Sequence, residues 1–411
     1  MRVLVAGRGA PAVRAAESCR ALGLEPVTVV ARSDPQRRHV TSGHLTLDDD
    51  SCAGYDCVDC IVGAAVDAGV EVVHPGSGGI AEDPRLGRSL AERGIGFAGP
   101  PPEVLDIVGD RGLVADAAHA VGVPTLPHAS GEQAVRDLVA RLGLPIALKD
   151  SDSLYGDGVR IIQSDAELAE ALASGTRPYA ERFVDAAQVI GVTVAVDDDG
   201  NAAVLGERET LLVAHSRKLL EATPVLGVPE TWVRAMRGDA LRLVRVLGLR
   251  NLATVEFLAH AGGYAFLEMN ARLTGGYRVC EAQAGLDLIA LQVELALGRR
   301  PSPQPPAATR QVHAVQAHLF IHSRPRLVTQ VRLPAPRPGV LVDCVLEGGR
   351  PVAFDVIGAQ VLATGSGRGQ ACRRVGRAVA GLELAGLPHA GPEIVQWCSH
   401  RYGAATREGA T

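Results

Sequence analysis

The sequence predicts a protein of mixed α/β and α+β architecture, built from three successive parts. Residues 1–108 alternate apolar runs with amphipathic segments, as in a Rossmann-like α/β unit with a parallel sheet. Residues 109–300 contain apolar runs that pair across short turn sequences, which indicates antiparallel hairpins combined with helices. A proline-rich linker then leads to residues 308–402, which we expect to form a small β-rich cap.

Composition and charge exclude several classes of protein. No apolar run approaches the ~20 residues that a membrane span needs, and the first residues are too quickly interrupted for a signal peptide. The net charge of −5 argues against a nucleic-acid surface, which normally carries a basic excess. The eight cysteines, in a chain of 411 residues without a secretion signal, are expected to stay reduced. We therefore predict a cytoplasmic protein that contacts neither membrane nor nucleic acid.

The first part is expected to alternate strands and helices. The pattern predicts strands over 3–6, 26–31 and 70–74, and helices over 10–22, 55–68, 81–93 and from 102 onward. Gly7-Arg8-Gly9 after the first strand superficially matches a dinucleotide-binding turn. However, Pro11 interrupts that motif, and Arg32 stands where an acidic residue would be expected. A tight turn is the better interpretation of this segment.

The beginning of the second part pairs a lysine with a small, polar loop. Helices are predicted over 109–121 and 131–142, and a strand over 144–149 ends at Lys149. The loop 150–158, which contains Gly156 and Gly158, separates it from a strand over 159–163 and a helix over 165–174. A lysine and free backbone N–H groups at such a hairpin suit triphosphate oxygens. An ordinary polar hairpin loop is the alternative, and we place this smaller lid subdomain at about 125–190.

A polar strand dominates the rest of the second part. Apolar runs over 254–259 and 264–269 flank a glycine-containing turn, which predicts a hairpin between helices over 230–247 and 287–297. The second run continues so that Glu268, Asn270 and Arg272 share one face of a strand. Glu256 on the partner strand can add a second carboxylate. Two carboxylates and an amide suit Mg²⁺ with phosphate, and a solvated edge hairpin is the alternative.

Lysine usage points to two positions. Of the 41 lysine and arginine residues, only Lys149 and Lys218 are lysine. In a chain that otherwise uses arginine, these two are candidates for places where a compact ammonium group is required.

With these pieces in place, the chain resembles the ATP-grasp superfamily and, within it, biotin carboxylase. The resemblance covers residues 1 to about 320 and rests on motifs in a fixed order. These motifs are Arg8-Gly9, His74-Pro75-Gly76, Phe97 to Pro100, Gly109-Asp110-Arg111, Pro145 to Lys149, Glu181-Arg182-Phe183, Lys218 with Glu221 to Pro224, Glu256-Phe257-Leu258, Glu268 to Arg272, and His313-Ala314-Val315.

The resemblance implies a role for each matching residue. Lys149 with Gly156 and Gly158 would hold ATP phosphates, helped by Arg111, while Glu181, Arg182, Phe183 and Val184 would form the adenine hinge over Leu258. Glu256, Glu268 and Asn270 would bind two Mg²⁺ ions, and Lys218 and Arg272 would face the transferred phosphoryl group. A homodimer is implied by the same analogy. Because no lysine follows Lys218 in this sequence, we expect no covalent biotin in cis.

The chain departs from the carboxylases where they bind bicarbonate and biotin. Thr274, Gly275 and Gly276 replace a glutamine, a valine and the glutamate base, and Ser216-Arg217 replace a histidine and a glutamine. Leu341 stands where the family has a biotin-binding arginine. Arg272-Leu273-Thr274-Gly275-Gly276 instead resembles the Asn-x-Arg-x-Gly-Gly segment of carboxylate–amine ligases. The expected substrate pocket is lined by His215, Arg217, Thr274, Gly275, Gly276 and Arg278.

Three functions are compatible with this pattern. The first is an ATP-dependent ligase that activates a small-molecule carboxylate as an acyl phosphate and joins it to an amine. The second is carboxylation of a small molecule or of biotin through carboxyphosphate, with His215 or Glu281 as the replacement base. The third is a non-catalytic nucleotide-binding protein. The chain keeps the residues that are expected to face the nucleotide and changes the segment that is expected to face the acceptor. This combination favours the first function.

Overall fold

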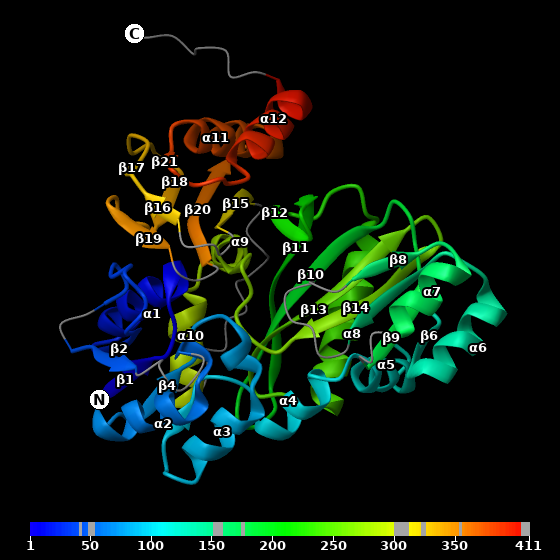
Figure 1. Ribbon diagram of the computed structural model, residues 1–411, viewed down its shortest axis with the longest axis horizontal. Helices are drawn as coiled ribbons and strands as arrows, with labels where there is room; N and C mark the ends of the chain where they lie inside the picture. Colours follow the sequence, from blue (N-terminus) through cyan, green and yellow to red (C-terminus); the bar gives the residue numbers. More distant parts are fainter. Residues whose placement is uncertain are drawn as a thin grey trace.

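The computed structural model describes residues 1–40, 43–47, 54–150, 159–173, 177–299, 312–321, 326–352 and 356–403. Figure 1 shows the N-terminal α/β unit beside the C-terminal part, with the lid sheet on the far side of the long central sheet. Gly156 and Gly158 lie outside the described residues. Within the described residues, no helix is both long and apolar enough to cross a membrane.

The N-terminal part is the predicted parallel α/β unit. Its strands β1 (Arg2–Val5), β2 (Glu25–Ala31), β3 (Leu45–Leu47), β4 (Val72–His74) and β5 (Gly96–Phe97) are ordered β3-β2-β1-β4-β5. The helices are α1 (Gly9–Ala21), α2 (Val58–Asp67), α3 (Pro84–Ala91) and α4 (Pro102–Val108). Helix α2 begins later than predicted because Gly54–Asp56 forms a 3-10 turn and the Cys57 side chain accepts a hydrogen bond from the Cys60 N–H as its N-cap.

The lid is a second, smaller sheet with the order β6-β9-β7-β8. It contains β6 (His128–Ser130), β7 (Ile146–Asp150), β8 (Arg160–Ile162) and β9 (Pro178–Arg182), together with α6 (Glu132–Leu142) and α7 (Asp165–Leu172). Helix α5 (Arg111–Ala120) leads into it, and Asp110 caps α5 by accepting from two backbone N–H groups. In the register, Lys149 pairs with Tyr179 and Ala147 with Glu181, so Lys149 and Glu181 project from the same face.

One antiparallel sheet joins the second and third parts of the chain. Its order is β14-β13-β10-β11-β12-β15-β20-β18. The strands are β10 (Gln188–Val196), β11 (Ala202–Ala214), β12 (Arg217–Thr223), β13 (Asn251–His260), β14 (Gly263–Asn270), β15 (His313–Ile321), β18 (Val340–Cys344) and β20 (Val356–Gly365). The pairing of β12 with β15 makes the C-terminal part an extension of the central sheet.

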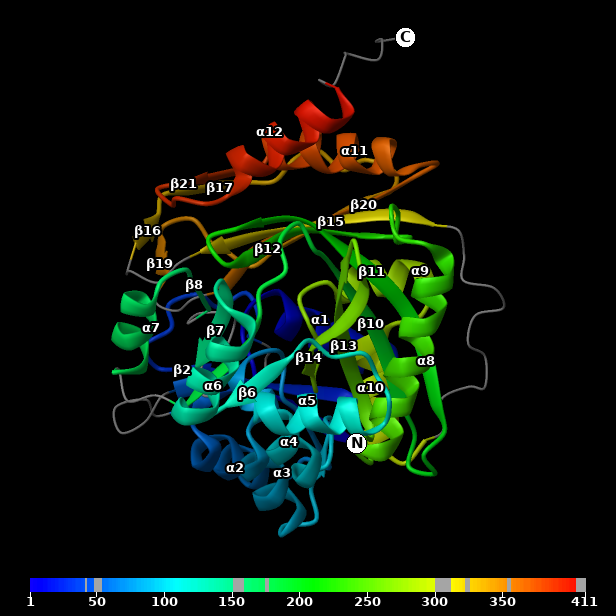
Figure 2. The same ribbon diagram turned by 90° about the vertical axis from the view of Figure 1, so that its right-hand side faces the viewer.

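Helices cover both ends of this sheet. Helix α8 (Glu230–Val246) packs on β10 and β11, and α9 (Tyr277–Ala284) on β11 and β15. Helix α10 (Leu288–Ala296) lies between α1 and the central sheet. Figure 2 shows α11 (Arg368–Ala380) and α12 (Gly391–Tyr402) lying over β15 and β20. Helix α12 was not predicted. The short strands β16 (Arg326–Val328), β17 (Gln330–Arg332), β19 (Arg350–Val352) and β21 (Glu383–Ala385) complete this part.

The N-terminal unit is fastened to the C-terminal part by a short segment after β2. Gln36 donates from its amide to the backbone carbonyls of Arg350 and Pro351, and it accepts from the Glu347 N–H. Arg38 donates to the Cys344 carbonyl at 2.9 Å. These bonds hold the two units on either side of a shared cavity.

Candidate active site

A cavity of about 680 Å³ lies where the three parts of the chain meet. The N-terminal unit contributes Gly7, Arg8, Pro11, Tyr55 and the turn from Ser77 to Asp83. The central sheet contributes the charged residues discussed below, and the C-terminal part adds His318, Phe320, Ile321 and Ile357. This volume is within the range of small-molecule sites in proteins.

The predicted hairpin places its two carboxylates side by side. Glu256 on β13 and Glu268 on β14 are directly opposite each other in the register, so both project from one face. We call β13 and β14 the carboxylate hairpin. The two lysine candidates and Arg111 gather around it. The Lys218 Nζ atom is 2.5 Å from Glu256 Oε1, and Arg111 Nη1 is 3.1 Å from Glu268 Oε2.

The charges of this cluster shift one another's pKa values. Burial alone would raise the pKa of Glu268, but Lys218, Arg111 and Lys149 outweigh it and lower the pKa to about 2. Burial would lower the pKa of Lys218, but the attraction of Glu256, Glu268 and Glu221 raises it instead. Burial raises the pKa of Glu256, with repulsion from Glu268 acting in the same direction and Lys218 opposing it. Near neutral pH, the ammonium group of Lys218 is therefore charged and the carboxyl group of Glu268 is deprotonated.

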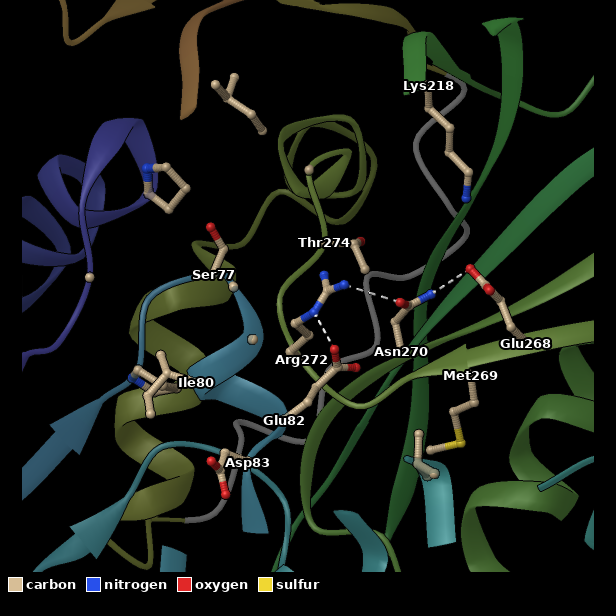
Figure 3. A pocket seen from close by; sticks show the side chains of 18 of the residues that line it. Ser77, Ile80, Glu82, Asp83, Lys218, Glu268, Met269, Asn270, Arg272 and Thr274 are labelled. Atoms are coloured by element: carbon tan, nitrogen blue, oxygen red, sulfur yellow. Dashed lines mark hydrogen bonds and ion pairs between the residues drawn. The ribbon is translucent and has the colours of Figure 1, made fainter. Parts of the chain in front are cut away.

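Asn270 and Arg272 extend the cluster toward the N-terminal unit. Asn270 donates from Nδ2 to Glu268 Oε1 at 3.3 Å, and it accepts from Arg272 Nη2 at 3.3 Å. Figure 3 shows this chain of polar side chains running from Glu268 to Arg272, with Glu82 beneath Arg272 and Thr274 beside it. Arg272 lies two residues beyond the end of β14. Its hydrogen bond to Asn270 nevertheless links it to the polar face that the alternation of residues predicted for this strand.

The oxygen donors of the carboxylate hairpin fit Mg²⁺. Glu256, Glu268 and Asn270 offer hard oxygen ligands on a face of the cavity, while the surrounding cations are placed to meet phosphate oxygens. Among the described residues, no group of three or more His, Cys, Asp or Glu side chains forms a complete metal cage.

The predicted nucleotide residues of the lid lie beside this cluster. The Lys149 Nζ atom is 2.6 Å from Glu181 Oε1, with both side chains buried, and the Tyr179 hydroxyl donates to Glu181 at 3.2 Å. Arg182 is exposed, whereas Phe183, Val184 and Leu258 are half-buried. Lys218 lines the cavity, whereas Lys149 lies close enough to help lower the pKa of Glu268 but does not line the cavity. The nucleotide-binding role of the lid residues stays a prediction.

A buried ion-pair network, which the sequence analysis missed, forms the other side of the cavity. Arg208 on β11 donates from Nε to Glu221 Oε1 at 2.6 Å and from Nη2 to Thr274 Oγ1 at 2.8 Å. His318 Nε2 is 3.0 Å from the other Glu221 oxygen, and its Nδ1 is 3.2 Å from the Gln360 amide nitrogen. Burial would raise the pKa of Glu221, but Arg208, His318 and Lys218 lower it well below its usual range. The run Glu207-Arg208-Glu209 inside an apolar strand was the available signal.

Comparison with known proteins agrees with this geometry. The family model for the N-terminal domain of biotin carboxylase matches residues 1–105, and that for the ATP-binding domain of the carbamoyl-phosphate synthase L chain matches residues 110–302. The chain is therefore similar to biotin carboxylase in its N-terminal part and to an ATP-binding domain in its central part. It is 29% identical to biotin carboxylase of Halalkalibacterium halodurans, covering 97% of this chain and 94% of the relative.

Solved structures show the same fold over almost the whole biotin carboxylase-like chain. The biotin carboxylase domain of a single-chain bacterial carboxylase is similar with a TM-score of 0.85 and 28% identity, covering 98% of this chain and 94% of that one. The biotin carboxylase domain dimer of the Hydrogenobacter thermophilus 2-oxoglutarate carboxylase, in complex with MgADP, ADP and bicarbonate, has a TM-score of 0.90 at 23% identity, with coverage of 98% and 96%.

Only some of the residues that we predicted to contact the acceptor substrate line the cavity. Arg217, Thr274 and Gly275 line the cavity as expected. The prediction for His215 is wrong, because its side chain is 68% exposed at the β11–β12 turn and lies 3.8 Å from Glu393. Arg278 is buried in ion pairs with Glu281 and Asp343, at 3.1 and 3.3 Å, so it also does not face the cavity.

The position of the family's glutamate base is closed in this chain. A Cβ atom on Gly276 would lie 2.4 Å from Arg208 Nε and 2.5 Å from Glu221 Oε2. The missing side chain at Gly276 therefore makes room for the buried Arg208–Glu221 pair. Glu281, the second candidate base, instead accepts from Arg278 and from the Leu288 N–H. Of the two replacement bases predicted from the sequence, Glu281 is thus hydrogen-bonded to other groups and His215 is exposed.

Proposed function

We propose that this protein is a Mg-ATP-dependent ligase that activates a carboxylate as an acyl phosphate and joins it to an amine. The observation that carries the proposal is the cluster in which Glu256 and Glu268 face Lys218, with Arg272 at the end of the same hydrogen-bonded chain. The full-length likeness to biotin carboxylases supports ATP-dependent carboxylase or ligase chemistry in general.

The proposed first step is phosphoryl transfer. A carboxylate oxygen attacks the γ-phosphorus of ATP, the bond to the β-phosphate oxygen breaks, and ADP leaves. Mg²⁺ bound by Glu256, Glu268 and Asn270 would neutralise phosphate charge. Lys149 and Arg111 would contact the phosphates, while Lys218 and Arg272 would orient the acid against them. Such chemistry depends on positioning and charge stabilisation more than on a protein nucleophile.

In the second step, an amine nitrogen attacks the acyl carbon. The C–N bond forms as the C–O bond to phosphate breaks, and the proton lost by the amine leaves with inorganic phosphate. The overall reaction converts acid, amine and ATP into amide, ADP and phosphate. The closed position at Gly276 supports this assignment over bicarbonate chemistry, because it leaves no room for the family's glutamate base.

A second candidate is carboxylation of a small-molecule nitrogen or of biotin through carboxyphosphate. It is favoured by relatives that match 94% or more of the chain and carry the name biotin carboxylase. The two candidates share the nucleotide site and differ in the acceptor. We also propose a homodimer, by analogy with the biotin carboxylase domain dimer of the Hydrogenobacter protein.

The deciding experiment traps the acyl phosphate. Purified protein is incubated with Mg-ATP and hydroxylamine, with bicarbonate or with single acids from a carboxylic-acid library. Hydroxamate from one acid, formed without bicarbonate, is the expected result. ADP release that requires bicarbonate would establish the carboxylase instead, and failure to bind Mg-ATP would leave only a non-catalytic role.

A further inference from the structure

An apolar wall borders the cavity beside Gly275. It consists of Pro11 near the start of α1, Phe320 on β15 and Ile357 on β20. Phe320 and Ile357 are cross-strand partners, so they form a continuous patch on neighbouring strands. Helix α1 packs against β20, which brings Pro11 to the same side of the molecule. We call these three residues the apolar wall.

Gly275 connects the apolar wall to the reacting end of the cavity. A Cβ atom built on Gly275 would lie 3.7 Å from Ile357 Cδ1 and 3.4 Å from His318 Cε1, which is ordinary van der Waals contact. The absence of a side chain at Gly275 therefore leaves a shallow space that a ligand atom could fill. Only two residues separate Gly275 from Arg272 in sequence, so this space begins at the predicted carboxylate-binding end.

The apolar wall is rigid and bordered by charges that already have partners. Ile321, the neighbour of Phe320 on β15, points into the core behind the wall, where a Cβ on Gly358 would lie 2.7 Å from Ile321 Cγ1. The Arg217 guanidinium lies 5.7 Å above the centre of the Phe320 ring, a cation–π arrangement that keeps Phe320 in place. Glu221 is paired with Arg208 and His318 on the adjoining side.

We propose that the apolar wall binds the hydrocarbon part of the carboxylate substrate, so that the acid carries a branched aliphatic or aromatic group. This inference rests on the proposed ligase function and names its substrate class. Bicarbonate offers only polar atoms, and burying these against the wall would leave hydrogen bonds unmade. A larger acid can place its carboxylate at Arg272 and Lys218. Its apolar group then packs on Phe320 and Ile357, so that both its polar and its apolar parts meet matching groups of the cavity.

The test varies the size of the acid while the chemistry stays constant. Hydroxamate formation is measured with acetate, propionate, butyrate, isovalerate and phenylacetate, each with Mg-ATP and hydroxylamine and without an amine. Because burying one methylene is worth about 0.8 kcal/mol, we expect the apparent KM to fall about fourfold for each added carbon until the wall is covered. Ile357→Trp should abolish the advantage of the larger acids. The matched control is Val246→Trp at the end of α8, a position that is 57% exposed and does not line the cavity.

The outcomes separate the inference from the proposed function. Hydroxamate that forms equally well from all five acids, or that is insensitive to Ile357→Trp, overturns the apolar-wall inference and leaves the ligase assignment standing. A size dependence that appears only when amines are varied assigns the wall to the amine and also overturns it. No hydroxamate from any acid, with ADP release that requires bicarbonate, overturns the ligase function and the inference with it.

Discussion

Arg272 donates a hydrogen bond from Nε to Glu82 Oε2 at 2.8 Å, and this bond ties the end of the carboxylate hairpin to the N-terminal unit. The two residues are 190 positions apart in sequence, and both line the cavity. Since Glu82 lies on the turn after β4, the N-terminal unit orients the residue that we expect to bind the substrate carboxylate.

Removing Glu82 should misplace Arg272. We expect Glu82→Ala to lower kcat/KM for the acid by roughly 10- to 100-fold, because a small displacement of an orienting group is costly in catalysis. Glu82→Gln keeps an oxygen acceptor and should retain most of the activity. Equal losses in both variants would show that the charge of Glu82, and not its hydrogen bond to Arg272, is what matters.

Lys218→Ala should abolish turnover with little loss of ATP binding. An ammonium directed at developing charge typically contributes about 10²- to 10³-fold to kcat, and in this cluster its pKa is raised, so it remains charged. Turnover is measured as ADP release and nucleotide affinity by calorimetry. Lys149→Ala is the comparison, since we expect the lid lysine to weaken ATP binding itself. Retained turnover in Lys218→Ala would remove the basis of the mechanism.

Glu268→Gln should raise the Mg²⁺ concentration needed for activity. The amide keeps the shape of the side chain and removes the charge that Arg111 contacts and that we propose binds Mg²⁺. We expect the half-maximal Mg²⁺ concentration to rise by about tenfold or more at constant ATP. An unchanged Mg²⁺ requirement would place the metal elsewhere in the site.

Filling Gly276 should destabilise the fold and should not restore a carboxylase. A Cβ at this position meets the buried Arg208–Glu221 pair at 2.4 and 2.5 Å, so Gly276→Ala is expected to cost about 1–3 kcal/mol of unfolding free energy. Gly275→Ala makes only ordinary contacts and serves as the control in chemical denaturation. Bicarbonate-dependent activity gained by Gly276→Glu would contradict this steric argument.

Acidification should destabilise the protein through His74. Burial is the main cause that lowers the pKa of His74 to about 4, and the residue bonds Gln292 and the Gly76 N–H. Between pH 6.5 and about 4, the unfolded chain binds a proton at this histidine and the folded chain does not, so the free energy of unfolding falls as pH falls through this window.

The size of this effect can be bounded and assigned to His74. The pKa difference corresponds to at most roughly 3 kcal/mol, fully lost by about pH 4. His74→Gln, which retains hydrogen-bonding capacity, should flatten the pH dependence of the denaturation midpoint between pH 6.5 and 4.5. An unchanged slope in this variant would assign the acid sensitivity to other groups.

The sequence by itself determined the local elements and the paired carboxylates of the carboxylate hairpin. Alternation of polar and apolar residues predicted the carboxylate hairpin, and the register indeed places Glu256 opposite Glu268. The scarcity of lysine singled out Lys149 and Lys218, which both lie at this cluster. These signals succeed because strand periodicity and residue chemistry are local properties that a single chain displays directly.

Only the tertiary structure decided the acceptor side of the cavity. Arg208, Glu221 and His318 come from three different strands, and their pairing depends on the order β11-β12-β15 in the central sheet. The same packing closes Gly276, exposes His215 and turns Arg278 toward Asp343. Sequence spacing cannot indicate such contacts, because whether a side chain meets solvent, ligand or an ion-pair partner is set by which distant strands become neighbours.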